Sequence, residues 1–133
     1  MILQRFAIES HIAPNGALFI CDDASLGFQI RRVFFIAAEV GAVRGKHAHR
    51  RQRQVLMCAA GSILVEAVLP DGSRESVLLS QGYGVEVNPL VWTTQEFCAP
   101  DSVLVVICDD TFDESDYIRS FEEFLEVSGR IAR

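Results

Sequence analysis

The sequence lacks an apolar run long enough to cross a bilayer. Its strongest apolar stretches, residues 33–38 and 103–108, fall well short of the roughly 18 to 20 residues that a transmembrane helix needs. The first residues do not show a basic segment, an apolar run and a small-residue cleavage site in succession, so we expect no signal peptide. These absences predict a cytoplasmic protein that does not associate with membranes.

Cysteine is sparse, and its four positions lack the Cys-x-x-Cys spacing that is typical of zinc sites. Each cysteine lies in or beside an apolar run, where a reduced thiol behaves as a small buried hydrophobe. We therefore expect four reduced core thiols, with no disulfide framework and no zinc site. The four residues are Cys21, Cys58, Cys98 and Cys108.

Positive charge is also scarce, with twelve Lys and Arg against eighteen Asp and Glu, and the pI of about 5.0 disfavours nucleic-acid binding. Five of the twelve basic residues fall within residues 44–53, together with two of the three histidines and no acidic residue. The rest of the chain therefore carries a charge of −11. A solvated turn could have this charge pattern, but the histidines within it favour a binding site for a small anion.

Half of the 133 residues are hydrophobic and nine are Phe, enough apolar surface for the core of one domain, residues 1–133. Short β-branched runs alternate with turn signals such as Asn15-Gly16 and Asp71-Gly72. This pattern predicts an all-β fold, a small antiparallel barrel or jelly roll. Expected strands cover residues 17–21, 28–38, 54–58, 62–69, 74–79, 84–87 and 102–108.

The last segment, about residues 112–133, has a different pattern. Possible N-cap residues between Asp113 and Asp116 precede apolar residues that recur at helical spacing. We expect a short C-terminal helical segment that packs on the barrel. Its apolar residues are Tyr117, Ile118, Phe121, Phe124 and Leu125.

One spacing stands out in the chain, namely Gly41, His47, His49, Gln54 and Gly61. It resembles the first motif of the cupin superfamily, in which a glycine, a His-x-His pair, a glutamate and a second glycine recur at these intervals. Residues two apart in a strand project from the same face, so both histidines would point into the mouth of the barrel.

In metal-binding cupins, the glutamate and a later histidine complete the ligand set. This chain has Gln54 at the first position and Thr93 at the second. Two imidazoles and a neutral amide make a poor site for a divalent cation. We therefore expect no tightly held metal, and His11, the remaining histidine, is expected to be a surface residue.

A closer resemblance covers almost the whole chain and rests on five motifs in order. They resemble those of the WxcM-like, FdtA/QdtA-type sugar 3,4-ketoisomerases. The resemblance implies a metal-independent, dimeric cupin that needs no cofactor. Its substrate would be a TDP-linked keto-deoxysugar, whose keto group moves between carbons 4 and 3 through an enediol in deoxy- or amino-sugar biosynthesis. The motifs are RVFFI (32–36), RGKHAH (44–49), QVLMC (54–58), PLVW (89–92) and DESDYIR (113–119).

The resemblance also implies roles for particular residues. His49 and His47 would be the acid/base pair, with His49 as the principal base, because histidine transfers protons near neutral pH. Arg44, with Arg31 or Lys46, would hold the diphosphate.

Gln54 would hydrogen-bond the sugar. Trp92 would either stack on the ligand or serve as an ordinary core aromatic.

Two positions depart from the family pattern. The family usually has a tyrosine within the run Phe34-Phe35 and commonly has a histidine at Thr93. We include Phe35 and Thr93 among the substrate-binding residues. Three alternatives therefore stay open: an isomerase of variant substrate or regiochemistry, a non-catalytic cupin that binds a nucleotide sugar, and a metal-dependent cupin.

Overall fold

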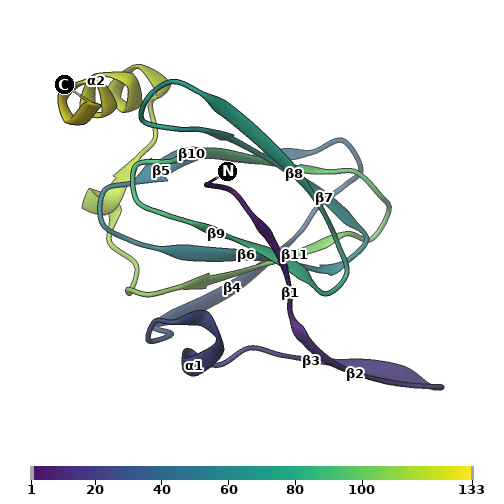
Figure 1. Cartoon of the computed structure of the whole chain (residues 1–133). Helices are drawn as coiled ribbons and strands as arrows, with labels where there is room; N and C mark the ends of the chain where they lie inside the picture. The colour runs from purple at the N-terminus through teal and green to yellow at the C-terminus, as the bar shows by residue number, and fades with distance from the viewer. Residues whose placement is uncertain (1, 133) are drawn as a thin grey trace.

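Two antiparallel sheets of five strands face each other in the computed structural model, which describes residues 2–132 (Figure 1). The first sheet contains, in order, β1 (Arg5–Ala7), β9 (Tyr83–Val87), β6 (Gln54–Ala60), β11 (Val103–Cys108) and β4 (Arg32–Ala37). The second contains β12 (Tyr117–Ile118), β5 (Val43–His49), β10 (Trp92–Phe97), β7 (Ser62–Val68) and β8 (Arg74–Ser80). This arrangement confirms the all-β expectation.

The main core fills the space between the sheets. Side chains alternate across each strand, so β7 contributes Ile63 and Val65 to the core, and β11 contributes Leu104 and Val106. Phe97 at the end of β10 is fully buried among them. A well-packed interior of this kind provides a rigid support for side chains at the open end of the barrel.

A hairpin of β2 (Glu9–Ala13) and β3 (Gly16–Ile20) projects from the two sheets (Figure 1). The turn expected at Asn15-Gly16 joins these strands, and the turn at Asp71-Gly72 joins β7 to β8 with Gly72 at a φ of 86°. Both turn predictions are confirmed. A short helix, α1 (Asp23–Leu26), follows the hairpin and leads toward β4.

The expected short C-terminal helix is confirmed, but it begins only at Phe121, which corrects the helical start expected near residue 112. Asp113 caps a 3-10 helix, Glu114–Asp116, and the chain then extends so that Tyr117 pairs with His49. The helix α2 (Phe121–Ala132) begins three residues after β12 and lies against the second sheet (Figure 1). The apolar side chains of Tyr117 and Ile118 fit a helical period, but they lie in a strand because β5 offers an unpaired edge.

Other sequence expectations are confirmed in outline, with changes at the edges. Five strands, β1, β2, β5, β10 and β12, lie outside the strand ranges expected from the sequence. All four cysteines are free, but Cys98 is exposed after the end of β10 and is not a core thiol. Within residues 2–132, no helix is long and apolar enough to cross a membrane.

Candidate active site

An irregularity in β5 precedes the paired histidines. Opposite Thr94 and Thr93 of β10 lie Gly45 and His47, so Lys46 between them is the extra residue of a β-bulge. Gly45 has a φ of 85°, and a Cβ there would lie 2.5 Å from Gln95 Oε1, so glycine is required at this position. Regular strand structure resumes at His47, and His49 follows two residues later on the same face.

His49 is held by a buried carboxylate. Its Nδ1 lies 2.9 Å from Asp116 Oδ2, and the two side chains are only 4% and 3% exposed. The other oxygen, Asp116 Oδ1, accepts a hydrogen bond from the backbone N–H of Arg51 at 2.7 Å. A carboxylate at Nδ1 favours the tautomer that carries the proton on Nδ1, so the lone pair lies on Nε2.

That Nε2 atom is buried and has no hydrogen-bond partner among the described residues. Burial lowers the pKa of His49, because the charged imidazolium loses hydration, and the nearby Arg32 and Arg119 act in the same direction. Asp116 opposes this shift by favouring the charged form. The result is an oriented, neutral imidazole whose free nitrogen can accept a proton.

His47 lies beside His49, with the ring centroids 5.1 Å apart and the rings nearly perpendicular. Burial, with a smaller contribution from His49, lowers the pKa of His47 to about 4. His47 is therefore neutral at pH 7, and two neutral imidazoles share one end of the barrel.

Tyr117 completes an aromatic group with the two histidines. Its ring centroid lies 4.4 Å from that of His49 and 5.1 Å from that of His47. Arg32 Nη2 donates a hydrogen bond to the Tyr117 hydroxyl at 2.9 Å, and the Arg119 guanidinium lies 4.2 Å from the ring centroid. Two cations therefore flank the phenol.

A cavity of about 30 Å³ lies between the sheets next to His47. Gln54 lines it, and its Nε2 donates hydrogen bonds to Gln52 Oε1 at 3.0 Å and Cys108 Sγ at 3.4 Å. Thr93 lies opposite His47 on β10, and its hydroxyl accepts a hydrogen bond from Gln95 Nε2 at 2.8 Å. The structure thus brings Gln54 and Thr93 to the histidine site.

The basic run of the sequence divides into two parts. Arg50, Arg51 and Arg53 form ion pairs with acidic residues elsewhere in the chain, so part of the concentrated charge is structural. Arg44 and Lys46 are exposed on β5, where no ion pair engages them within the described chain.

Arg31, the residue that precedes β4, is also exposed. The cations that lower the pKa values of both histidines are instead Arg32 and Arg119.

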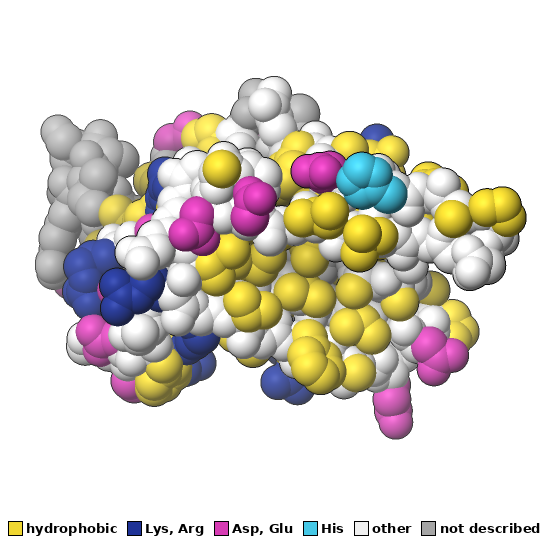
Figure 2. Space-filling model, turned by 90° about the horizontal axis from the view of Figure 1, so that it is seen from below, with side chains coloured by type: hydrophobic (Ala, Val, Ile, Leu, Met, Phe, Trp, Pro, Cys, Tyr) yellow, Lys and Arg dark blue, Asp and Glu magenta, His cyan; other side chains and the backbone are white. Residues whose placement is uncertain are grey.

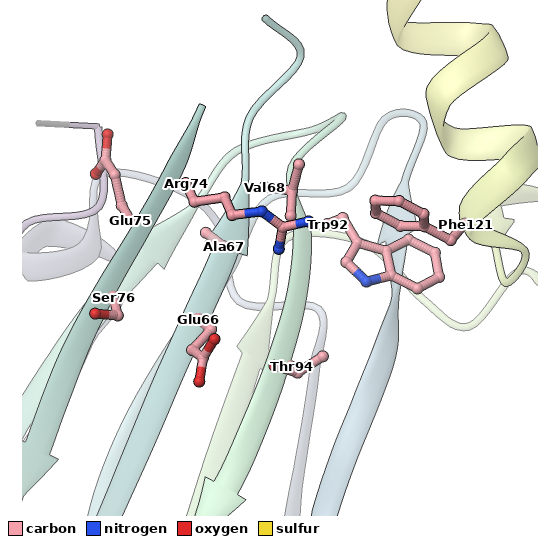
Figure 3. Close-up of a pocket in the computed structure, with 9 residues that line it drawn as sticks. All are labelled: Glu66, Ala67, Val68, Arg74, Glu75, Ser76, Trp92, Thr94 and Phe121. Carbon is pink, nitrogen blue, oxygen red and sulfur yellow. The ribbon is translucent and has the colours of Figure 1, made fainter. Parts of the chain in front are cut away.

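The structure does not bring Trp92 or Phe35 to the histidines. Trp92 lies on the outer face of the second sheet beside Phe121 (Figure 3), with their ring centroids 5.3 Å apart. The ring centroid of Phe124 is 5.8 Å from that of Trp92. It is only 8% exposed and borders an outer cavity of about 310 Å³ that is separate from the histidine site. Of the two expected roles, the structure supports the core aromatic.

Phe35 projects from the opposite side of the molecule. Residues alternate along β4, so Phe34 borders the cavity beside His47 and Phe35 is 72% exposed on the outer face. Phe35 therefore points away from the histidines and Phe34 occupies the inner position, and the expectation that Phe35 binds the substrate stays a prediction.

Sequence reasoning missed three residues of the site: Arg32, Asp116 and Tyr117. The spacing of apolar residues around Tyr117 predicted a helix where the structure has the strand that brings Asp116 to His49. No local pattern marks an Asp as the partner of a distant His. The available signal was the resemblance of residues 113–119 and 32–36 to family motifs, which include all three residues.

The donor set also bears on metal binding. Within residues 2–132, no group of three or more His, Cys, Asp or Glu side chains is placed to hold a metal ion. The expectation of a metal-free site stays a prediction that metal analysis can test.

Two facing sheets with paired histidines at one end of the barrel define a cupin-like protein. Residues 3–129 match the FdtA family, described as WxcM-like, C-terminal, and the chain belongs to this family. It is 36% identical over 124 residues to the TDP-4-oxo-6-deoxy-alpha-D-glucose-3,4-oxoisomerase of Aneurinibacillus thermoaerophilus, a match that covers 90% of this chain and 88% of that protein.

Solved structures agree with this assignment. The 3,4-ketoisomerase QdtA from Thermoanaerobacterium thermosaccharolyticum in complex with TDP superposes with a TM-score of 0.90 at 26% identity, covering 98% of this chain and 96% of that one. A mutant of the same enzyme in complex with TDP-4-keto-6-deoxyglucose gives a TM-score of 0.89 at 25% identity, covering 97% and 95%.

Proposed function

We propose that this protein is a 3,4-ketoisomerase of a TDP-linked 4-keto-6-deoxyhexose in deoxysugar biosynthesis. The observation that carries the proposal is the His49–Asp116 hydrogen bond, which leaves a buried Nε2 free as a base. The relative and the solved ketoisomerases named above support the choice of substrate.

A shift of a keto group between adjacent carbons moves protons only. His49 Nε2 removes the proton from carbon 3, which yields an enediol, and returns a proton to carbon 4. Asp116 stabilises the imidazolium that forms between these steps, as the carboxylate does in a His–Asp pair of a hydrolase. No redox cofactor is needed, because the sugar is neither oxidised nor reduced overall.

Exposed cations near the site would bind the diphosphate. Arg44, Lys46 and Arg31 are exposed, and none of them forms an ion pair within the described residues. A guanidinium fork matches two phosphate oxygens, so Arg44 is the principal anchor in this proposal. Gln54 lines the cavity beside His47 and Thr93 pairs with His47 across the sheet, so both side chains would hydrogen-bond sugar hydroxyls in this proposal.

Reaction with TDP-4-keto-6-deoxyglucose in deuterium oxide tests the function directly. NMR should show deuterium entering at carbon 3 of the 4-keto form. A 3-keto product should also accumulate. Binding of TDP without exchange or product would refute catalysis and favour a binding module. Metal analysis of the purified protein should find no stoichiometric iron, manganese or zinc, and stoichiometric metal would refute metal independence.

We also propose a homodimer. Hydrophobic side chains gather on the face that carries β4 and the projecting hairpin (Figure 2). Val33 and Phe35 of β4 are exposed there, as are Ile12 and Leu18 of the hairpin. A second copy of the chain would cover this apolar surface, because β4 is also an unpaired sheet edge. Light scattering should give a dimer mass that Phe35→Asp reduces, and a monomer mass would contradict the proposal.

A further inference from the structure

The keto shift requires proton transfers at oxygen as well as at carbon. As the proton leaves carbon 3, the oxygen on carbon 4 must gain one to give the enediol. The oxygen on carbon 3 must then lose its proton as carbon 4 gains one. His49 serves the two adjacent carbons, so a second group is needed to carry a proton between the two oxygens.

His47 is a poor candidate for that group. Its pKa of about 4 leaves it neutral at pH 7, so it has no imidazolium proton to give. Its ring is nearly perpendicular to that of His49 and tilted by 56° to that of Tyr117, and both centroid distances are 5.1 Å. His47 therefore positions its neighbours and lines the cavity next to Gln54.

Tyr117 has the required chemistry and position. It lies directly opposite His49 in the β12–β5 pair, so the two side chains are cross-strand neighbours. Its hydroxyl oxygen accepts the hydrogen bond from Arg32 Nη2, and no acceptor engages the hydroxyl hydrogen within residues 2–132. That hydrogen is free to be donated to a ligand.

Two guanidinium groups lie beside the negative charge that donation would leave on Tyr117. Arg32 contacts the oxygen at 2.9 Å, and Arg119 lies 4.2 Å from the ring centroid. Arg32 Nε is itself buried without a hydrogen-bond partner among the described residues, which indicates that this guanidinium faces a ligand. The only other tyrosine, Tyr83, lies on β9 and is exposed.

We propose that Tyr117 is the oxygen-side acid and base of the isomerisation, with Arg32 as its positioning residue. This rests on the proposed function. The Tyr117 O–H bond breaks as its proton passes to the oxygen on carbon 4, while His49 takes the proton from carbon 3. The phenolate then takes the proton from the oxygen on carbon 3 as His49 protonates carbon 4. Both side chains return to their starting states, and no electrons leave the sugar.

Tyr117→Phe tests the proposal, because it keeps the ring contacts and removes only the hydroxyl. We expect kcat to fall about 100-fold or more, with the Kd for TDP changed less than about twofold. A loss of kcat without a matching change in Kd is a result that a purely structural role would not give. Tyr83→Phe is the matched control and should leave kcat unchanged.

The outcomes separate this proposal from the proposed function. If the unmodified protein forms no product, the function itself fails. If it is active and Tyr117→Phe keeps its kcat, the role of Tyr117 is refuted. Arg32→Gln provides a second route if Tyr117→Phe does not fold: it should lower kcat at least tenfold while TDP still binds, and an unchanged kcat would refute the proposal.

Discussion

Asp116 binds His49 through a 2.9 Å hydrogen bond to Nδ1, although 67 positions separate the two residues in the sequence. β12 makes this contact, because its pairing with β5 places Tyr117 opposite His49 and the buried carboxylate just before it. The orientation of the proposed base therefore depends on a two-residue strand. Substitutions that disturb that strand should therefore lower kcat more than they weaken ligand binding.

Asp116→Asn should lower kcat about 100-fold or more, because an amide no longer stabilises the imidazolium and no longer selects one tautomer. The Kd for TDP, measured by calorimetry, should change little. Asp113→Asn is the matched control: this half-buried residue caps the adjacent 3-10 helix and pairs with Arg51. Equal losses of kcat in both variants would show that Asp116 acts only through local folding.

The pH dependence of kcat/KM should reflect a base with a lowered pKa. His49 must be neutral to accept a proton, and burial lowers its pKa below the usual value of about 6.5. The acid limb of the profile should therefore lie below pH 6.5, with activity lost only as pH falls through that region. An acid limb centred above pH 7 would contradict the electrostatics of the site.

Stability should also fall in acid because of His47. Its folded pKa is about 4, so the unfolded chain binds protons more readily between about pH 6.5 and pH 4. As the pH is lowered through this window, the free energy of unfolding should decrease by up to about 3 kcal/mol because of this residue. Above pH 6.5 the full stabilising contribution of His47 is present. Urea unfolding at each pH should show a shallower dependence for His47→Gln, and an identical dependence would contradict the assigned shift.

Trp92 should matter for stability and not for the ligand. It packs against Phe121 and Phe124 under α2, so Trp92→Ala should reduce the free energy of unfolding by about 3 to 5 kcal/mol. Leu125→Ala on the exposed side of α2 should cost much less. If a folded Trp92→Phe variant lost TDP binding, the conclusion that Trp92 lies away from the ligand site would be wrong.

The sequence predicted those parts of the fold that depend on local patterns. Short β-branched apolar runs between turn signals located β7 and β11, and Asp71-Gly72 located a turn, because strand propensity and turn chemistry are properties of neighbouring residues. The helical spacing of Tyr117 and Ile118 misled, because pairing with β5 is a tertiary effect. The side of the sheet on which Trp92 lies also depends on the strand register, which spacing alone did not reveal.

The site was predicted in part for the same reason. His47 and His49 could be found from a two-residue spacing on one strand, whereas their partners Arg32 and Asp116 come from other strands and turns. The basic run suggested one anion site, but ion pairs engage Arg50, Arg51 and Arg53. The cytoplasmic location stays a prediction.

The central claim is that His49 is the base that acts on carbon 3, and exchange of deuterium into TDP-4-keto-6-deoxyglucose tests it most directly. The unmodified protein and the control His11→Asn, which changes an exposed histidine bonded to Glu9, should both incorporate deuterium at carbon 3. His49→Asn should show no exchange while it binds TDP with unchanged affinity. Exchange by His49→Asn at the rate of the unmodified protein would contradict the account.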